Sequence, residues 1–409
     1  MAQTTNVIII GAGPSGSIAA AILQNKGHQV TIIERETFPR FSIGESLLPQ
    51  CMEFIEQAGM LDAVMAAGFQ LKSGAAFLHN GKTSEFCFSE KFTTGFNTTF
   101  QVQRDSFDQL LASEAQRMGV EIRWQQQVIA ADFNGFKPLI TVKESSGNSY
   151  QIEADFVLDA SGFGRVLPRL LNLEKPSDFP VRQSLFTHLE DRIDCPQYDR
   201  NHIRIIVHPT LQDVWYWLIP FSNGRCSLGV VAEPDVFQAL GNENQQIFQQ
   251  LIAQEPELAL LLKNAVFDTD VRSITGYSAN VSSLYGKGYA LLGNAGEFLD
   301  PVFSSGVTIA MKSASLAADV LDRQLNKQEV DWQTEFVEPL QIGVETFRTF
   351  VTSWYQGDLQ DVVFYDQKPG NIKEMICSIL AGYVWDTENP YVKKSRLRLK
   401  TLAEICRLA

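Results

Sequence analysis

A glycine-rich turn near the start of the chain constrains its fold more than any other feature. An apolar run at residues 6–10 (NVIII) leads into Gly11, Gly13 and Gly16, and an alanine-rich stretch follows. In such a turn the first glycine permits a tight bend, the second lets a phosphate approach the backbone, and the third lets a helix pack closely on the strand. Because the free N–H groups of a helix N-terminus attract anions, the turn predicts a pyrophosphate site.

A second apolar run, at residues 30–33, ends on Glu34. A carboxylate about 20 residues beyond such glycines is placed to accept hydrogen bonds from ribose hydroxyl groups. A GxGxxG sequence alone is weak evidence, but one that follows a strand, opens a helix and precedes a correctly spaced acid is strong evidence. The chain is therefore predicted to bind a dinucleotide. The same site is expected to include the neighbouring residues Pro14, Ser15, Arg35 and Arg40.

A second strand–turn–helix pattern lies near residue 290. Residues 289–292 (YALL) are predicted to form a strand, a turn containing Asn294 follows, and spacing typical of a helix begins at Ser305. This pattern resembles the second flavin contact of FAD enzymes of the aromatic hydroxylase superfamily. The resemblance implies that FAD is the cofactor, that Asn294 holds its ribityl chain, and that Gly306 and Val307 lie beside the flavin ring. The superfamily usually has Asp where this chain has Asn294, and Asn still accepts a hydrogen bond but carries no charge.

Composition narrows the possible partners. The chain has 409 residues and a net charge of −13, with 45% hydrophobic and 20% charged residues, which is typical of a globular protein large enough for two domains. The negative balance argues against a general partner made of nucleic acid or anionic membrane. A short basic cluster at residues 393–400 departs from this balance and is interpreted as a solvated helix face.

Other classes are disfavoured by what the sequence lacks. It has no uninterrupted apolar run of about 18 residues, so no transmembrane segment is expected. Its six cysteines form no CxxC pair and its five histidines do not cluster, so no metal site is expected. The first residues run directly into the nucleotide strand without a cleavable apolar segment, which makes the cytoplasm the expected location.

The order of predicted elements indicates an α/β fold. We expect a three-layer Rossmann-like FAD-binding domain, an inserted β-sheet substrate domain and a helical C-terminal cap. The FAD domain is predicted to be discontinuous, covering residues 1–80, 100–180 and 270–325. The β-rich substrate domain is assigned to residues 81–99 and 181–269, and the helical region to residues 326–409. A turn ending at Gly162 follows another predicted strand and is expected to lie beside the FAD.

Three further segments narrow the family. They are residues 38–49 (FPRFSIGESLLP), 215–220 (WYWLIP) and 300–306 (DPVFSSG). Together with the dinucleotide pattern they resemble flavin-dependent halogenases, whose characteristic Trp-x-Trp-x-Ile-Pro block is matched here. The resemblance covers about residues 5–325. It includes the GES sequence that ends at Ser46 and the RxxFDxxL sequence that begins at Arg104, both expected beside the cofactor.

The resemblance also implies a set of catalytic residues. In this family reduced FAD and oxygen convert halide to hypohalous acid, and a lysine amine binds that acid and presents it to the substrate. Lys72 occupies the corresponding place, on a predicted strand between the GES loop and the RxxFD helix, and the protonation of a buried lysine is tunable. Halide is expected at the backbone N–H groups of Ser305 and Gly306. Trp215 and Trp217, on one face of a strand, would keep the substrate away from the flavin.

The substrate and the source of electrons remain open at this point. Phe303 stands where tryptophan halogenases carry Glu, which favours a phenolic or pyrrolic ring over free tryptophan. The halogenase resemblance implies a hydrophobic small-molecule substrate and a separate flavin reductase. In a self-sufficient monooxygenase or dehydrogenase, by contrast, NAD(P)H would reduce the bound FAD directly.

Other interpretations of the same residues also remain open. The WYWLIP block resembles that of geranylgeranyl reductases too, relatives that bind FAD and hydrogenate prenyl chains, so a reductase acting on a lipid-like substrate is the main alternative. A protein that holds flavin without turnover is a third possibility. Most lysines are simply solvated, and most tryptophans on strands belong to the core.

Overall fold

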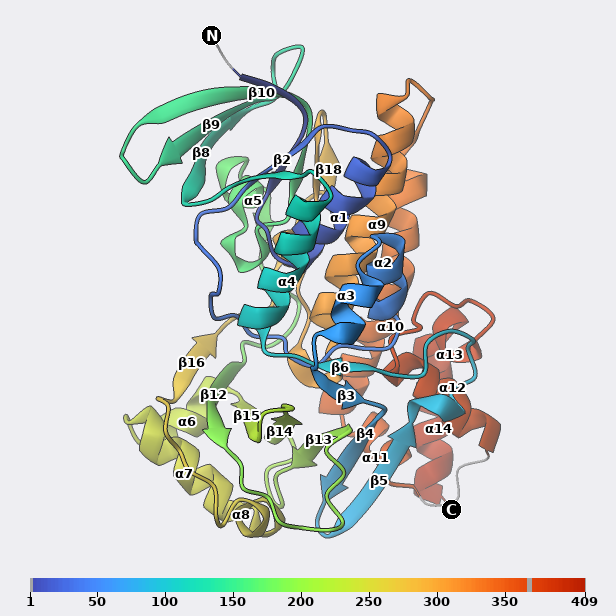
Figure 1. Cartoon of the computed structure of the whole chain (residues 1–409). Helices are drawn as coiled ribbons and strands as arrows, with labels where there is room; N and C mark the ends of the chain where they lie inside the picture. Colours follow the sequence, from blue (N-terminus) through green and yellow to red (C-terminus); the bar gives the residue numbers. More distant parts are fainter. Residues whose placement is uncertain (1–2, 366–369, 409) are drawn as a thin grey trace.

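A computed structural model describes residues 3–365 and 370–408. It contains two large β-sheets, each packed against helices, and a helical C-terminal region beside the second sheet (Figure 1). No helix in the described ranges is long and apolar enough to cross a lipid bilayer.

The first sheet is built around β1 (Gln3–Ile10), whose apolar residues from Val7 to Ile10 are buried, as expected of a strand covered on both faces. β1 pairs in parallel with β2 and with β10, and β10 pairs in parallel with β19. The strand order is β18-β19-β10-β1-β2-β7, and β8 and β9 extend β10 as an antiparallel ribbon. The bounds are Val30–Ile33 for β2, Glu121–Arg123 for β7, Gln126–Asp132 for β8, Leu139–Glu144 for β9, Ser149–Asp159 for β10, Tyr285–Gly286 for β18 and Tyr289–Leu291 for β19.

Three long helices cover the first sheet. They are α1 (Pro14–Asn25), α4 (Arg104–Arg117) and α9 (Ser305–Leu325), and α1 packs against both of the others. Two shorter helices, α2 (Cys51–Gln57) and α3 (Leu61–Ala66), lie beside them (Figure 1). α1 approaches the preceding turn so closely that a Cβ atom on Gly16 would lie 1.9 Å from the carbonyl oxygen of Gly11. Gly16 is therefore required by packing.

The second sheet has the order β16-β12-β15-β14-β13-β4-β5. Its strands are β4 (Gly74–His79), β5 (Lys82–Cys87), β12 (Gln183–Glu190), β13 (His202–Val207), β14 (Trp215–Pro220), β15 (Arg225–Ala232) and β16 (Arg272–Thr275). One face packs on α6 (Pro234–Leu240), α7 (Asn244–Gln254) and α8 (Pro256–Leu261). Alternation along β14 places Tyr216 in that layer, whereas Trp215 and Trp217 lie on the opposite face and join the main core.

The remaining elements connect and close the two sheets. β3 (Gln70–Lys72) pairs with β6 (Thr99–Gln101), β11 (Glu174–Lys175) pairs with β17 (Asn280–Val281), and α5 (Val166–Leu170) follows β10. The C-terminal region contains a π-helical turn (Gln333–Val337), α10 (Glu338–Tyr355), α11 (Asp358–Phe364), α12 (Gly370–Leu380), α13 (Pro390–Lys393) and α14 (Ser395–Leu408). α10 packs against α9, and α11 and α12 pack against β5, so this region touches both halves of the molecule.

The predicted α/β fold is confirmed, and so are the two strand–turn–helix units at β1–α1 and at β19–α9. The exact domain boundaries stay a prediction. Strand pairing places β4 and β16 in the second sheet, although their residues fall within the ranges 1–80 and 270–325 that the sequence assigned to the FAD domain. Local sequence patterns could not reveal which sheet β4 joins, because β4 pairs with β13 across more than 100 intervening residues.

We predict that Gly16→Ala destabilises the protein by about 2 kcal/mol, because the new methyl group would collide with the backbone of the preceding turn. The free energy of unfolding in urea, measured without FAD, tests this. Gly13→Ala is the matched control, since a Cβ there meets only the guanidinium of Arg40 at 3.6 Å, and its cost should stay below about 1 kcal/mol. Equal stability of Gly16→Ala and the wild type would contradict the packing argument.

Candidate flavin site

A cavity of about 700 Å³ lies where the two glycine-rich turns meet the second sheet. The turns come together because β1, β10 and β19 are parallel neighbours, so the loops that follow them emerge at one edge of the sheet. Most of the predicted site residues line this cavity: Gly11, Gly13, Pro14, Ser15, Glu34, Arg35, Arg40, Ser46, Arg104, Gly162, Trp215, Trp217, Asn294, Gly306 and Val307. Gly16, Lys72 and Ser305 do not line it.

The first turn has the geometry expected of a pyrophosphate cradle. Gly11 has a positive φ of 98°, and a Cβ on it would lie 2.8 Å from the carbonyl oxygen of Ala160. Gly13 precedes the first residue of α1, where backbone N–H groups point outward. Glu34 directly follows β2, and its buried carboxylate accepts a hydrogen bond of 2.8 Å from the N–H of Ala12. Phosphate and ribose groups would therefore both find partners within this turn.

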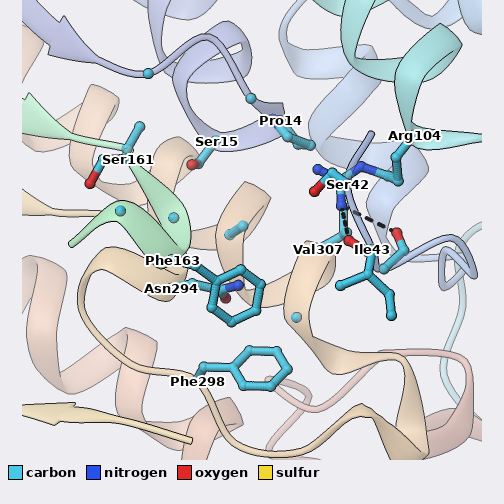
Figure 2. Close-up of a pocket in the computed structure, with 18 of the residues that line it drawn as sticks. Pro14, Ser15, Ser42, Ile43, Arg104, Ser161, Phe163, Asn294, Phe298 and Val307 are labelled. Carbon is cyan, nitrogen blue, oxygen red and sulfur yellow. Dashed lines mark hydrogen bonds between the residues drawn. The ribbon is translucent and has the colours of Figure 1, made fainter. Parts of the chain in front are cut away.

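The second turn offers an unpaired acceptor. The N–H of Gly293 donates to Ser313 Oγ at 2.9 Å, which fixes the start of the turn against α9. The side-chain oxygen Oδ1 of Asn294 is buried without a hydrogen-bond partner in the described residues. Asn294, Phe163 and Phe298 all line the cavity and are labelled in Figure 2. Because buried polar atoms rarely lack partners, this oxygen fits the hydroxyl group of a bound ribityl chain.

Arg104, on α4, holds the GES loop by hydrogen bonds. Arg104 donates from Nε and Nη2 to the carboxylate of Asp108 at 2.8 and 2.9 Å, and from Nη1 to the carbonyl oxygen of Ile43 at 2.6 Å (Figure 2 shows Arg104 beside Ile43). Gly44 takes a positive φ of 97° where a Cβ would lie 3.1 Å from Arg104 Nη1. Arg104 therefore acts through the shape of this loop, as well as lining the cavity itself.

Lys72 lies immediately behind the GES loop. It ends β3, is 1% exposed, and donates from Nζ to Ser46 Oγ and to the carbonyl oxygen of Leu47, both at 2.8 Å. The ring centroid of Phe88 is 5.4 Å from Nζ. Burial lowers the pKa of Lys72 to about 7. Ser46, which accepts one of these hydrogen bonds, lines the cavity, so the Lys72 amine lies directly behind that part of the wall.

The two tryptophans share one face of β14 and line the cavity together. Their ring centroids are 6.0 Å apart. Trp217 donates from Nε1 to Ser227 Oγ at 3.0 Å, and Trp215 donates to the Tyr355 hydroxyl at 3.0 Å. That hydroxyl donates to Asp300 at 2.9 Å, and burial raises the pKa of Asp300 to about 6. The indoles are thus held in fixed orientations by the sheet and by the C-terminal helix α10.

Sequence reasoning missed several lining residues. Phe163, in the short turn after β10, and Phe298, in the second turn, both line the cavity, and their rings meet edge to face with centroids 5.3 Å apart. No spacing in the sequence distinguishes them from ordinary aromatic residues. Glu45 also lines the cavity, and its place in the GES sequence could have identified it. Ser305 is buried, and its Oγ has no partner in the described residues.

Two glycine-rich turns enclose the cavity, Glu34 is placed to bind a ribose, and Asn294 offers an unpaired acceptor to a ribityl chain. This combination is typical of flavoproteins that bind FAD. Comparison with known proteins supports this class, because residues 4–333 match the protein family described as "FAD binding domain". The chain belongs to this family, and its cofactor is FAD.

The most informative relatives are halogenases. The chain is 30% identical over 328 residues to a tryptophan 2-halogenase from Chondromyces crocatus, a match that covers 77% of this chain and 60% of that longer protein. It is 29% identical over 400 residues to a 1H-pyrrole-2-carbonyl-[peptidyl-carrier protein] brominase from Pseudoalteromonas luteoviolacea, covering 94% of each chain. Among solved structures, a flavoprotein/dehydrogenase from Cytophaga hutchinsonii aligns with a TM-score of 0.96 and 45% identity over 99% of both chains.

We predict that Asn294→Ala weakens FAD binding about tenfold, the equivalent of one hydrogen bond. Stability without FAD should change little, because the deleted oxygen has no partner in the described protein. Fluorescence titration with FAD and urea unfolding measure the two quantities separately. Asn294→Asp retains an acceptor and should bind FAD within about threefold of the wild type. Wild-type affinity in Asn294→Ala would show that this oxygen does not hold the cofactor.

Proposed function

We propose that the protein is a flavin-dependent halogenase, an FAD-dependent oxidoreductase that uses reduced FAD, oxygen and halide to halogenate an electron-rich aromatic small molecule. The location of Lys72 carries this proposal. A lysine that is 1% exposed and whose amine contacts one hydroxyl and one carbonyl is costly to bury, so a chemical role is a better explanation for it than stability.

The cofactor would be held by residues that already have the required shape. The first turn would bind the pyrophosphate, Glu34 the ribose, and Asn294 the ribityl chain. Reduced FAD would supply two electrons for the reaction of oxygen with halide. The backbone N–H groups at Ser305 and Gly306, at the start of the 21-residue helix α9, would hold the halide.

Lys72 would receive the oxidised halogen and direct it to the substrate. With a pKa of about 7, its amine divides between the charged and neutral forms near neutral pH, because burial disfavours the charged form. The charged form can donate a hydrogen bond to hypohalous acid, and the neutral form can bind the halogen at Nζ. Ser46 and Leu47 would hold Nζ in place for this step.

The second sheet would act as the substrate domain. Trp215 and Trp217 would separate the substrate from the flavin, and a pyrrolic or phenolic ring fits the absence of a carboxylate at position 303. Phe303 is buried there, with its ring centroid 6.0 Å from that of Trp354. The resemblance to the pyrrole brominase makes a pyrrolic substrate the first to test. A separate flavin reductase as electron donor, and a place in the cytoplasm, complete the proposal.

A reductase acting on a lipid-like or prenyl substrate is the second candidate. Two observations favour it: the apolar side chains of Ile203, Ile205, Ile219 and Ile274 line the cavity, and the similar solved structure is described as a flavoprotein/dehydrogenase. The two candidates separate on the electron source. NAD(P)H consumption by the purified protein alone, without a partner reductase, would favour the direct reductase or monooxygenase over the halogenase.

We predict that Lys72→Met abolishes bromination of a panel of phenols and pyrroles and leaves oxidation of chemically reduced FAD unchanged. The substitution keeps most of the side-chain volume but removes the amine. Product formation and flavin absorbance, followed together with bromide and oxygen present, provide the test. Lys312→Met is the matched control, because burial also lowers the pKa of Lys312 but that lysine lies over Phe54 and Trp385, away from the cavity lining. Unchanged bromination by Lys72→Met would remove Lys72 from the mechanism.

A further inference from the structure

The GES loop contributes a carboxylate, Glu45, to the cavity. Glu45 lines the cavity, and its side chain is 2% exposed. The loop holds it firmly, since the N–H of Val102 donates to the Glu45 carbonyl oxygen at 2.7 Å. A carboxylate is rarely buried to this extent unless a cation or a proton compensates its charge. The partner of Glu45 therefore determines what this residue can do.

That partner is a histidine on the second sheet. Nε2 of His188, on β12, lies 2.5 Å from Oε1 of Glu45, and it is the ion-pair partner found for Glu45 in the described ranges. Arg104, which pins the same loop, is already engaged with Asp108 and Ile43. The pair can therefore hold one proton in either of two arrangements, carboxylic acid with imidazole or carboxylate with imidazolium. Exchange between them leaves the net charge of the buried site unchanged.

The two members of the pair face different surroundings. Glu45 is sealed except where it meets the cavity, whereas the His188 side chain is 19% exposed. The His188 ring contacts Phe41 and Phe221, at centroid distances of 5.7 and 5.2 Å, and Phe41 is itself 42% exposed. The imidazole thus stands between the buried carboxylate and the more open end of the site. Imidazole is the side chain best suited to passing protons near neutral pH.

We propose that Glu45 and His188 form a proton relay that carries protons from solvent into the flavin cavity. The assignment rests on the proposed function, because halogenation consumes protons. One aromatic C–H compound, one halide ion, one reduced FAD (FADH2), one oxygen molecule and one proton give the C–halogen product, FAD and two water molecules. Oxygen accepts four electrons, two from reduced FAD and two as C–H is replaced by C–halogen.

In this relay Glu45 gives its proton to an oxygen atom that ends in water, and His188 then reprotonates Glu45 from solvent. Glu45 is the catalytic member, because it lines the cavity where the reacting oxygen must lie. His188 acts through Glu45. Removing His188 should therefore slow turnover by about 100-fold, at the lower end of the range for lost general acid–base catalysis. A soluble acid that diffuses to the vacated position should restore much of this loss.

The test uses the full-length protein with chemically reduced FAD, bromide, oxygen and a phenol or pyrrole. Bromination rates are compared for the wild type, His188→Ala and His188→Gln, each with and without added imidazole. We expect both variants to lose about 100-fold. Added imidazole should raise the rate of His188→Ala at least tenfold, because it can occupy the emptied space. The increase should be smaller in His188→Gln. A purely structural role of His188 would not produce this rescue.

His28→Ala is the matched control. His28, between α1 and β2, forms another histidine–carboxylate pair, with Nε2 2.7 Å from Oδ1 of Asp322 on α9, and neither residue lines the cavity. Its loss should leave the rate within about twofold of the wild type, with no response to imidazole. A wild-type rate in His188→Gln would overturn the relay. So would a loss in His188→Ala that imidazole does not restore, in protein that still binds FAD normally.

The design separates failure of the relay from failure of the proposed function. If the wild type brominates nothing, halogenation is wrong, and the same variants are then compared for oxidation of anionic reduced FAD by oxygen. That reaction gives FAD and hydrogen peroxide and takes up one proton, so the relay predicts the same losses and the same rescue. Unchanged oxidation rates in both His188 variants would overturn the relay there. If His188→Ala does not fold, His188→Gln decides the outcome.

Discussion

The site depends on the anchoring of one short loop. Arg104 donates hydrogen bonds to Asp108 on its own helix and to the carbonyl oxygen of Ile43, and the next residue, Gly44, has a positive φ of 97°. The two residues that follow then face the cavity in fixed positions. Ser46 contacts Lys72 and Glu45 contacts His188, so one loop links both of these titratable residues to a single chamber. Without this anchor neither group would have a defined relation to a cofactor.

The chamber itself follows from parallel strand order. β1, β10 and β19 are neighbours in the first sheet although they lie far apart in the chain, and each leads into a loop at the same edge. The glycines in these loops keep the backbone accessible, and the second sheet closes the opposite side with its tryptophans. C-terminal helix α10 stabilises that side, since Tyr355 ties Trp215 to Asp300. The first sheet and its loops therefore form the cofactor side of the chamber, and the second sheet forms the proposed substrate side.

Much of this could be predicted from the sequence because local signals coincide with physical requirements. Gly16 in the motif predicted that α1 lies close to the preceding turn, and in the structure this contact leaves no room for a methyl group. The alternation in WYWLIP correctly placed Trp215 and Trp217 on one face. The roles of Phe163, Phe298 and His188 were not predictable, because these residues carry no distinctive spacing and meet the site only through tertiary packing. The membership of β4 in the second sheet was hidden for the same reason, since long-range pairing leaves no local trace.

We propose that both glycine-rich turns hold one FAD molecule in the chamber bounded by the GES loop. A crystal structure of the protein soaked with FAD would show whether they do. We expect the pyrophosphate at the N-terminus of α1, a ribityl hydroxyl within hydrogen-bond distance of Asn294 Oδ1, and the flavin ring between Gly306 and Ser46. A chamber without density for FAD, in crystals soaked at saturating concentration, or an FAD bound elsewhere on the protein, would contradict it.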